Sequence, residues 1–197
     1  MRIQKISYQD TKPFILDIHY AARMPSISYS FGLFSDESLI GVVTYGKPAS
    51  PPLCKGIAGI ENSHKVYELN RLVLLHNRPN QASTLISKSL KLLPSGLIIV
   101  SYADTAYNHS GYVYQATNWL YTGATKPRTD MYSSVGHSRH HDGDRTKRVN
   151  RSSKHRYITF TGTRRDKRTL RKLLRYKVYD FYPKEYMDSY PPVVTCA

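Results

Sequence analysis

An arginine stands inside an otherwise apolar or neutral run of the chain, in the segment LNRLVLL. A guanidinium that points from a strand into a cleft can grip a carboxylate or a phosphate through two parallel hydrogen bonds. Arg71 is therefore a candidate for holding an anionic group. Two structural alternatives remain open, an exposed strand arginine or an ion-pair partner of Glu68, although strand alternation places Arg71 and Glu68 on opposite faces.

An acidic and a phenolic side chain follow the apolar run GLIIV. Asp104 stands at the predicted carboxyl end of a central parallel strand, where the active sites of open α/β sheets form. Its carboxylate could accept a proton from an amine, hold a metal or cap the next helix. Tyr114 comes ten residues later and could stabilise a developing negative charge, act as an acid or base, stack on a base or pack in the core.

An imidazole and a phenol stand side by side at His19 and Tyr20, near the predicted end of a helix. They could bring metal-ligating atoms toward Asp104, although a lone helix histidine is more often structural. One histidine and one carboxylate fall short of the two-histidine, one-carboxylate set that binds iron, and His109 could supply the second histidine.

A second group of histidines lies in the segment HSRHHDGDRTKR. His137, His140 and His141 could suggest zinc, but no cysteine accompanies them and basic neighbours would repel a cation. Contact with phosphate is the preferred interpretation of this segment.

Alternating strand and helix patterns in the first half of the chain would position these residues. Residues 1–6 predict a strand, 9–24 a helix with Pro13 in its first turn, 26–46 a hairpin and 48–65 a loop. Two strands with a helix between them follow, which implies a crossover and a parallel pair. These three predicted elements cover residues 66–75, 81–93 and 95–102.

The second half of the chain has a less regular pattern. Residues 111–121 predict a helix that gives way to a short strand at 119–123, and 126–154 predict a polar loop. A strand at 155–162 and a basic helix at 164–178 follow, and the remaining residues predict an extended arm.

Positive charge is concentrated in one segment. The formal net charge is +15, and residues 126–177 hold 17 Lys and Arg against 4 Asp and Glu, so this segment alone carries 17 − 4 = +13. Basic side chains release counterions from a phosphate backbone, and interleaved aromatic rings stack on bases. The pattern predicts a nucleic-acid partner, with a solubilising tail or a ribosome-like RNA contact as the alternatives.

Two groups of basic residues are the candidates for this contact. One group lies in the predicted loop and the other recurs along one flank of the predicted basic helix. The candidates are Arg139, Arg145, Lys147 and Arg148 in the loop, and Arg164, Arg168, Arg171 and Arg175 on the helix. Such contacts carry little sequence information, so base preference is expected to come from a pocket that receives a flipped base.

Cysteine usage and hydropathy limit the compartment. Cys54 and Cys196 are 142 residues apart, lack the spacing of a zinc site and are predicted to be free thiols. The chain has neither a run of eighteen apolar residues nor a signal-peptide centre. We therefore expect no membrane partner and a cytoplasmic location.

Several of these segments together resemble the Mom family of phage DNA-modification proteins. They are ILDIHYAARMP, ELNRLVLL with the helix after it, VSYAD, HSGYVYQATNWLYTG and HRYITF, and the resemblance covers residues 10–177. It implies a GNAT-like acyltransferase fold, with a mixed central sheet, flanking helices and a basic C-terminal extension. It further implies transfer of a carbamoylmethyl group to the exocyclic amine of adenine in DNA, which protects phage DNA from host restriction enzymes.

The resemblance also assigns roles to individual residues. It implies that Arg71, Asp104 and Tyr114 are required and that His19 and Tyr20 match the family's His-Tyr pair. It associates the family with iron, for which His19 and Asp104 are the candidate ligands.

One segment departs from ordinary GNAT enzymes. Those enzymes hold the coenzyme A pyrophosphate on a glycine-rich loop before a helix, and this chain has HNRPNQAST there. Without glycines the backbone cannot approach a pyrophosphate as closely, so a donor other than acetyl-CoA is predicted. Asn80, Ser83 and Thr84 either contact that unknown donor or cap the helix.

The sequence thus predicts a single GNAT-like catalytic domain over residues 1–177, with 126–177 as its nucleic-acid-contacting part and 178–197 as a Tyr- and Pro-rich arm. The predicted activity is modification of adenine in double-stranded DNA inside the phage's host, and a homodimer is a candidate assembly. The alternatives are an acyltransferase that acts on tRNA or protein and a noncatalytic DNA-binding accessory protein.

Overall fold

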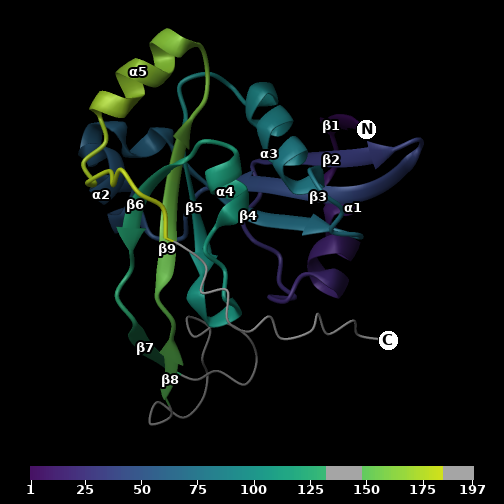
Figure 1. Ribbon diagram of the computed structural model, residues 1–197, viewed down its shortest axis with the longest axis horizontal. Coiled ribbons are helices and arrows are strands. Elements are labelled where there is room, and N and C mark those ends of the chain that lie inside the picture. Colours follow the sequence, from purple (N-terminus) through teal and green to yellow (C-terminus); the bar gives the residue numbers. More distant parts are fainter. Residues whose placement is uncertain (132–147, 184–197) are drawn as a thin grey trace.

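A seven-stranded mixed sheet organises the protein, as a computed structural model shows (Figure 1). The structure describes residues 1–131 and 148–183. The strand order is β1-β2-β3-β4-β5-β9-β6, and every neighbouring pair is antiparallel except β4 and β5. The strands are β1 (Arg2–Lys5), β2 (Tyr29–Ser35), β3 (Ser38–Gly46), β4 (Val66–Leu74), β5 (Ile98–Asp104), β6 (Leu120–Ala124) and β9 (Lys154–Phe160).

Helices cover both faces of this sheet. Helices α3 and α4 pack on one face with a core that includes Leu85 and Trp119, whereas η1, α2 and α5 pack on the other with Ile15, Ile57 and Leu170. The helices are α1 (Tyr8–Pro13), η1 (Phe14–Ile18), α2 (Pro51–Asn62), η2 (Ser63–Lys65), α3 (Gln81–Leu92), η3 (Thr105–Tyr107), α4 (Tyr112–Ala116) and α5 (Arg164–Lys172). None of these helices is long and apolar enough to cross a membrane, within the part of the chain that the structure describes.

The predicted strands and the parallel pair are confirmed. Strand β5 is central and almost wholly buried, as its continuous apolar run predicted, and α3 supplies the crossover between β4 and β5. Leu85 and Ile86 of α3 are fully buried against the sheet. The fold therefore brings the carboxyl ends of β4 and β5 to one region of the molecule.

Residues 48–65 are not the predicted loop, because a helix occupies most of them. Pro51 stands at the first position of α2, where proline fits because that amide has no partner within the helix. Ile57 and Ala58 are buried, and the positive φ of Gly59 (79°) kinks the helix. Cys54 is a buried free thiol of this helix, and Cys196 lies outside the described residues.

The first helix is shorter than predicted. Ser7 caps it through a reciprocal capping box with Asp10, so the helix begins at Tyr8. Pro13 then stands at the end of α1 and not in its first turn. The π-helical turn η1 follows and ends at Ile18, which leaves His19 in extended backbone.

The predicted loop at 126–154 contains two paired strands, β7 (Arg128–Met131) and β8 (Arg148–Arg151). We call this pair the basic arm, and Figure 1 shows that it extends beyond the lower ends of β6 and β9. The basic helix α5 is shorter than predicted, ending at Lys172. Of the predicted C-terminal arm, the described part lies against β6, where the Tyr179 amide donates to the carbonyl of Tyr121 at 3.0 Å.

Candidate functional site

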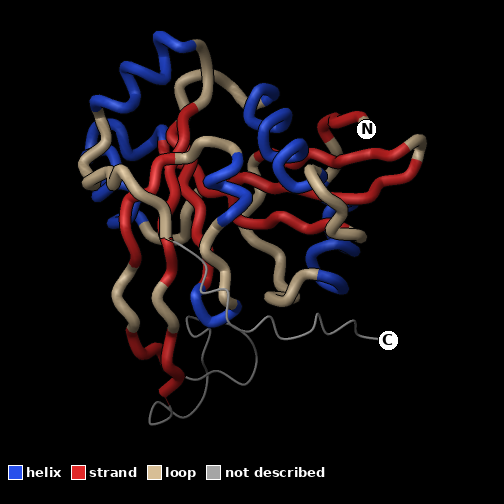
Figure 2. The backbone as a smooth tube through the Cα atoms, viewed as in Figure 1, coloured by secondary structure: helices blue, strands red, loops and turns tan. Residues whose placement is uncertain are grey.

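The parallel strands β4 and β5 pair over a short length and then separate. Val66, Tyr67 and Glu68 are paired with the first three residues of β5, and the remaining residues of β4 turn away (Figure 2). Beyond that point the Ser101 hydroxyl donates to the carbonyl of Leu69 at 2.9 Å. We call this region, residues 68–74 of β4 and 101–104 of β5, the strand opening.

A bulge in β4 determines which side chains face the strand opening. Thr44 of β3 pairs with Arg71 and Tyr45 pairs with Leu69, so Asn70 is an extra residue. The Asn70 side chain accepts from the Thr44 hydroxyl at 2.6 Å and donates to the carbonyl of Ser26 at 2.8 Å. These two bonds hold the bulge in place.

The bulge overturns the expected separation of Arg71 from Glu68. Leu69 and Leu72 both pack in the core beneath α3, although residues three apart in a regular strand face opposite ways. Glu68 and Arg71 therefore share the other side, and each shifts the pKa of the other. The two charges thus act on each other across the same side, although no ion pair joins them among the described residues.

The Arg71 guanidinium is half-buried and only partly used. One terminal nitrogen donates to the carbonyl of Asn70 at 2.6 Å and the other donates to the carbonyl of Arg23 at 2.9 Å. Its Nε is buried without a hydrogen-bond partner among the described residues. Burial lowers the pKa of Arg71, and the charge of Arg23 lowers it further. A buried donor of this kind is costly unless something accepts from it, so the position is suited to an anion.

Glu68 is the partly buried carboxyl beside this arginine. Burial raises its pKa, and the charges of Arg71 and Lys154 offset part of that rise. The carboxyl is also close enough to raise the pKa of Tyr114. Sequence reasoning treated Glu68 only as a possible partner of Arg71, because without the bulge it appears on the wrong face.

His19 and Tyr20 follow η1 and stack on each other, with ring centroids 4.3 Å apart. The His19 Nδ1 accepts from the Ala21 amide at 3.0 Å. Burial and then the charge of Arg71 lower the pKa of His19 to about 4, so the imidazole is neutral at pH 7. The Tyr20 ring also packs against Tyr107 of η3 at 4.5 Å.

Tyr20 connects the two sides of the strand opening. Burial raises its pKa, the Asp104 carboxylate raises it further and Arg71 lowers it. The phenol is therefore within electrostatic range of both predicted charges, and the side chain remains 57 % exposed.

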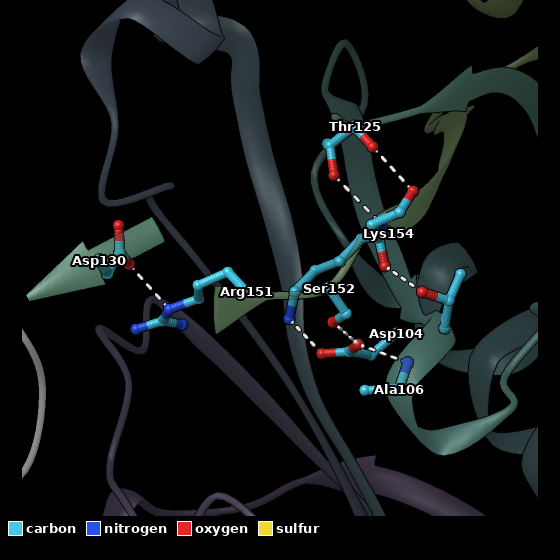
Figure 3. Close-up of polar contacts among 9 residues, drawn as sticks. Asp104, Ala106, Thr125, Asp130, Arg151, Ser152 and Lys154 are labelled. Carbon is cyan, nitrogen blue, oxygen red and sulfur yellow. Dashed lines mark hydrogen bonds and ion pairs between the residues drawn. The ribbon is translucent and has the colours of Figure 1, made fainter. Parts of the chain in front are cut away.

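Asp104 is buried and fully engaged (Figure 3). One carboxylate oxygen accepts from the Ala106 amide at 3.1 Å and from the Ser152 hydroxyl, and the other forms an ion pair with Lys154 at 2.6 Å. Burial raises the pKa of Asp104, but these partners outweigh burial and leave it below its ordinary value. Asp104 is thus an ionised group that caps η3 and joins β5 to the base of the basic arm.

Tyr114 lies in the core at the start of α4. Its hydroxyl is hydrogen-bonded to the Ser101 hydroxyl at 2.7 Å, and its ring packs between Trp119 and Tyr157 at 5.0 and 5.3 Å. Burial raises the pKa of Tyr114 to about 12, so the phenol keeps its proton. The ring of Tyr114 thus packs in the core, which is one of the predicted alternatives, whereas its hydroxyl contacts the strand opening through Ser101.

The three predicted donor-binding residues lie together at the start of α3. Asn80 has a left-handed backbone (φ 64°) and its side chain makes no capping bond. Instead the carbonyl of Asn80 accepts from the Ser83 hydroxyl at 3.2 Å and from the Thr84 amide at 2.9 Å. The side-chain capping alternative is therefore wrong for Asn80, and a donor contact by these residues stays a prediction.

The candidate iron ligands do not form a metal site. No group of three or more His, Cys, Asp or Glu that could hold a metal occurs within residues 1–131 and 148–183. The Lys154 ammonium lies against Asp104, and His109 is an exposed residue that stacks near Tyr107. His137, His140 and His141 lie outside the described residues. The donor set does not fit iron, and no step is assigned to a metal.

The predicted nucleic-acid contacts separate into three groups. Arg148 is exposed on β8 of the basic arm, and Arg164, Arg168 and Arg171 are exposed on α5. Arg139, Arg145 and Lys147 lie outside the described residues. The predicted position of Arg175 on the flank of α5 is wrong, because α5 ends three residues before it. The Arg175 amide instead donates to the carbonyl of Ile57 at 2.9 Å. Its guanidinium lies against Gly59 of α2 and not on the flank of α5.

Comparison with known sequences identifies one family. A model of the Mom protein family matches residues 1–184. The methylcarbamoylase Mom of Escherichia phage Mu is 33 % identical over 131 residues, which are 63 % of this chain and 54 % of that protein. The aligned part thus spans about half the length of the phage Mu relative.

Comparison with solved structures shows the fold. The aminoglycoside 6′-N-acetyltransferase of Enterococcus faecium superposes with a TM-score of 0.51 at 12 % identity, covering 83 % of this chain and 99 % of that one. A GNAT-family acetyltransferase of Bacillus cereus gives a TM-score of 0.48 at 14 % identity, covering 82 % and 98 %. The predicted GNAT-like architecture is confirmed, and this likeness carries no information about the donor.

Proposed function

The chain belongs to the Mom protein family, and from this we propose that it is a phage DNA-modification enzyme that transfers a carbamoylmethyl-type group to the exocyclic amine of adenine. The modified base would protect the DNA from host restriction enzymes. The proposal rests on the name of the phage Mu relative, a methylcarbamoylase, and on the chemistry gathered at the strand opening.

The observation that carries the proposal is the unused Nε of Arg71 beside a carboxyl whose pKa is raised by burial. Transfer to an amine forms a bond from nitrogen to the transferred carbon, breaks the bond between that carbon and its leaving group and releases a proton from the amine. A cation is needed where negative charge develops on the donor, and a base is needed for the proton.

Arg71 would supply the cation in this scheme. Its buried Nε and the neighbouring terminal nitrogen would donate to an anionic oxygen of the donor. Neutral His19 would not add a second positive charge at this point, so the site would favour a single anionic group.

Glu68 is the described carboxyl best suited to accept the proton. Its raised pKa makes it a stronger base than Asp104, whose pKa is held down by Lys154 and Ser152. Asp104 would act as a positioning residue that holds η3 and the base of the basic arm. Tyr114 and Tyr20 would donate hydrogen bonds, because burial keeps both phenols protonated.

The test is nucleoside mass spectrometry on plasmid DNA from cells that express the wild type or the Arg71→Lys variant. Lysine keeps the charge but loses the planar fork, so we expect a carbamoylmethyl-type adenine nucleoside with the wild type and none with Arg71→Lys. Arg2→Lys is the matched control, since Arg2 is an exposed strand arginine far along the sheet at β1, and it should modify DNA normally.

Other results would favour the alternatives. A modified nucleoside in digested tRNA but not in DNA would favour an acyltransferase that acts on tRNA. Unmodified nucleic acid together with normal DNA binding by both variants would favour a DNA-binding accessory protein. Asp104→Ala alone is a weaker test, because it also removes the contacts that hold the basic arm.

A further inference from the structure

A basic groove lies between α3 and α5, away from the strand opening. Its volume is about 820 Å³. Ser95 and Gly162 line it at the amino-terminal end of β5, together with residues of α3, the α4–β6 turn, β9 and α5. We call it the α3–α5 groove, and its basic lining residues are Lys91, Arg164, Lys167, Arg168 and Arg171.

The cations of the groove are not neutralised by neighbouring acids. Within the described residues, no ion pair joins any of the five to an acidic side chain, and no acid lines the groove. The one acid of α5, Asp166, is engaged at the start of the helix, where it accepts from the amide and hydroxyl of Thr163 at 2.8 and 2.7 Å. The positive field of the groove is therefore open to a ligand.

The rotation of α5 about its own axis places these side chains along one flank of the helix. Leu170 is buried against Phe160 and Ile158, which fixes how the helix is rolled. At about 100° per residue, the four α5 cations of the groove fall within one sector about 100° wide. Arg165 and Lys172 do not line the groove, and they lie about 140° and 120° around the helix from the midpoint between Lys167 and Arg171.

The α3–α5 groove and the basic arm lie at opposite ends of the same strands. In the pairing of β5 with β9, Ile98 is opposite Phe160 and Asp104 is opposite Lys154. Six steps along β5 therefore separate the groove from Asp104, a distance of about 20 Å. Figure 1 shows α5 at the upper end of β9 and the basic arm at the lower end.

We propose that the α3–α5 groove binds the phosphate backbone of the same DNA duplex whose target base enters the strand opening. This inference rests on the proposed function for its substrate. A distance of about 20 Å corresponds to about six base pairs at 3.4 Å each, so one duplex laid along β9 meets both groups of cations. The groove fixes the path of the duplex and carries no base specificity.

A duplex fits these observations better than a free nucleotide does. The cations come from two helices and are exposed along an open groove, whereas nucleotide phosphates are usually held by backbone amides in a glycine-rich loop. The separation of the groove from the basic arm also matches an extended polyanion. A small phosphate ligand is retained as an outcome of the test.

The experiment compares two double variants of the same helix in duplex DNA binding at several salt concentrations. Lys167→Gln with Arg171→Gln removes one lysine and one arginine from the groove. Arg165→Gln with Lys172→Gln removes the same two residue types from positions of α5 that do not line the groove and is the matched control. We expect the groove variant to flatten the plot of log K against log salt by about 2 units, and the control to leave the slope near that of the wild type.

Each outcome decides the matter. If both double variants flatten the salt dependence equally, or if the groove variant does not flatten it, the groove does not bind the DNA backbone. DNA would remain the proposed substrate. Loss of inorganic tripolyphosphate binding by the groove variant with an unchanged DNA slope would assign the groove to a small ligand and overturn the inference. A wild type that binds RNA and not duplex DNA would overturn the proposed function as well. Thermal unfolding of both variants identifies any that fail to fold.

Discussion

Charges at the strand opening are set by burial and by one arginine. Arg71 lowers the pKa of Glu68 and of Tyr20, and its positive charge also disfavours a proton on His19. At neutral pH Arg71 therefore lies beside a carboxyl with a raised pKa, a neutral imidazole and a protonated phenol, with the charges of Arg23 and Lys154 also acting on the site. This pattern follows from the bulge at Asn70, which turns Arg71 toward Glu68.

Replacing Arg71 with an uncharged residue should raise the pKa of His19. Burial and Arg71 together lower that pKa to about 4. In Arg71→Met we expect it to rise toward its ordinary value near 6.5 without reaching it, because burial remains. Titration of the imidazole ring protons by NMR measures the change. His155 is the internal control, since burial alone lowers its pKa and Arg71 makes no contribution.

The sign of the effect on stability follows from the same pKa. The folded pKa of His19 lies below the unfolded value, so the unfolded chain binds more protons between about pH 6.5 and 4. The contribution of the neutral imidazole is complete above about pH 6.5 and declines as the pH falls through that window. A His19 that titrates near 6.5 in the wild type would contradict this account.

Asp104→Asn should destabilise the protein at pH 7 and less at pH 3. The carboxylate forms an ion pair with Lys154, and loss of this pair is expected to lower the free energy of unfolding by about 1–3 kcal/mol. Because the folded pKa is depressed below 3.8, this stabilisation is present above about pH 4 and is lost as the wild-type carboxyl is protonated. Urea unfolding at the two pH values measures it.

Asp17→Asn serves as the comparison for Asp104→Asn. Asp17 is exposed on η1, so its replacement should change the free energy of unfolding by no more than about 0.5 kcal/mol. An Asp104→Asn effect of equal size at both pH values would show that the ion pair with Lys154 does not stabilise the fold.

At the scale of elements, strong periodic patterns predicted most of the sheet. The buried apolar run at β5 predicted a strand, and the amphipathic pattern of α3 predicted a helix. Helix α2 was missed because its prolines and glycines are typical of loops, yet Pro51 is at a position that tolerates proline and Gly59 only kinks the helix. The bulge at Asn70 was missed because the local sequence LNRL contains no glycine or other signal for it.

The start of α4 depends on a glycine that no other residue can replace. Gly111 has φ 86°, and a Cβ there would lie 2.3 Å from the Tyr157 ring. Gly111→Ala should therefore displace Tyr157 and shift Tyr114, with a cost of about 1–3 kcal/mol in unfolding free energy and loss of modification activity. Chemical unfolding and nucleoside analysis of the same variant test both effects.

Gly96→Ala isolates the steric part of that effect. Gly96 also has a positive φ (87°), but a Cβ there meets nothing within 4 Å. Its variant should bear only the backbone strain and keep its activity. Equal loss of activity in Gly96→Ala and Gly111→Ala would show that the Tyr157 contact does not position Tyr114.

At the scale of the whole molecule, long-range contacts limited what the sequence could predict about the site. Carboxyl ends of parallel strands and the family resemblance pointed to Arg71 and Asp104, and both lie at the strand opening. The partners that make Asp104 an ionised junction, Ser152 and Lys154, are about fifty residues further along the chain. No local pattern of sequence reports such a contact, so the roles of proton acceptor, metal ligand and helix cap all remained open for Asp104.

The chain segment beyond α5 has a consequence for how these molecules behave when crowded together. Tyr179 donates its amide to β6, and the Tyr182 hydroxyl donates to the carbonyl of Trp119 at 2.8 Å, so the outer side of the last strand is covered. The opposite border, β1, is only four residues long and carries Arg2 and Lys5. Short, charged or covered borders discourage strands of separate molecules from joining. A strongly cationic protein is thereby kept from aggregating along its own sheet.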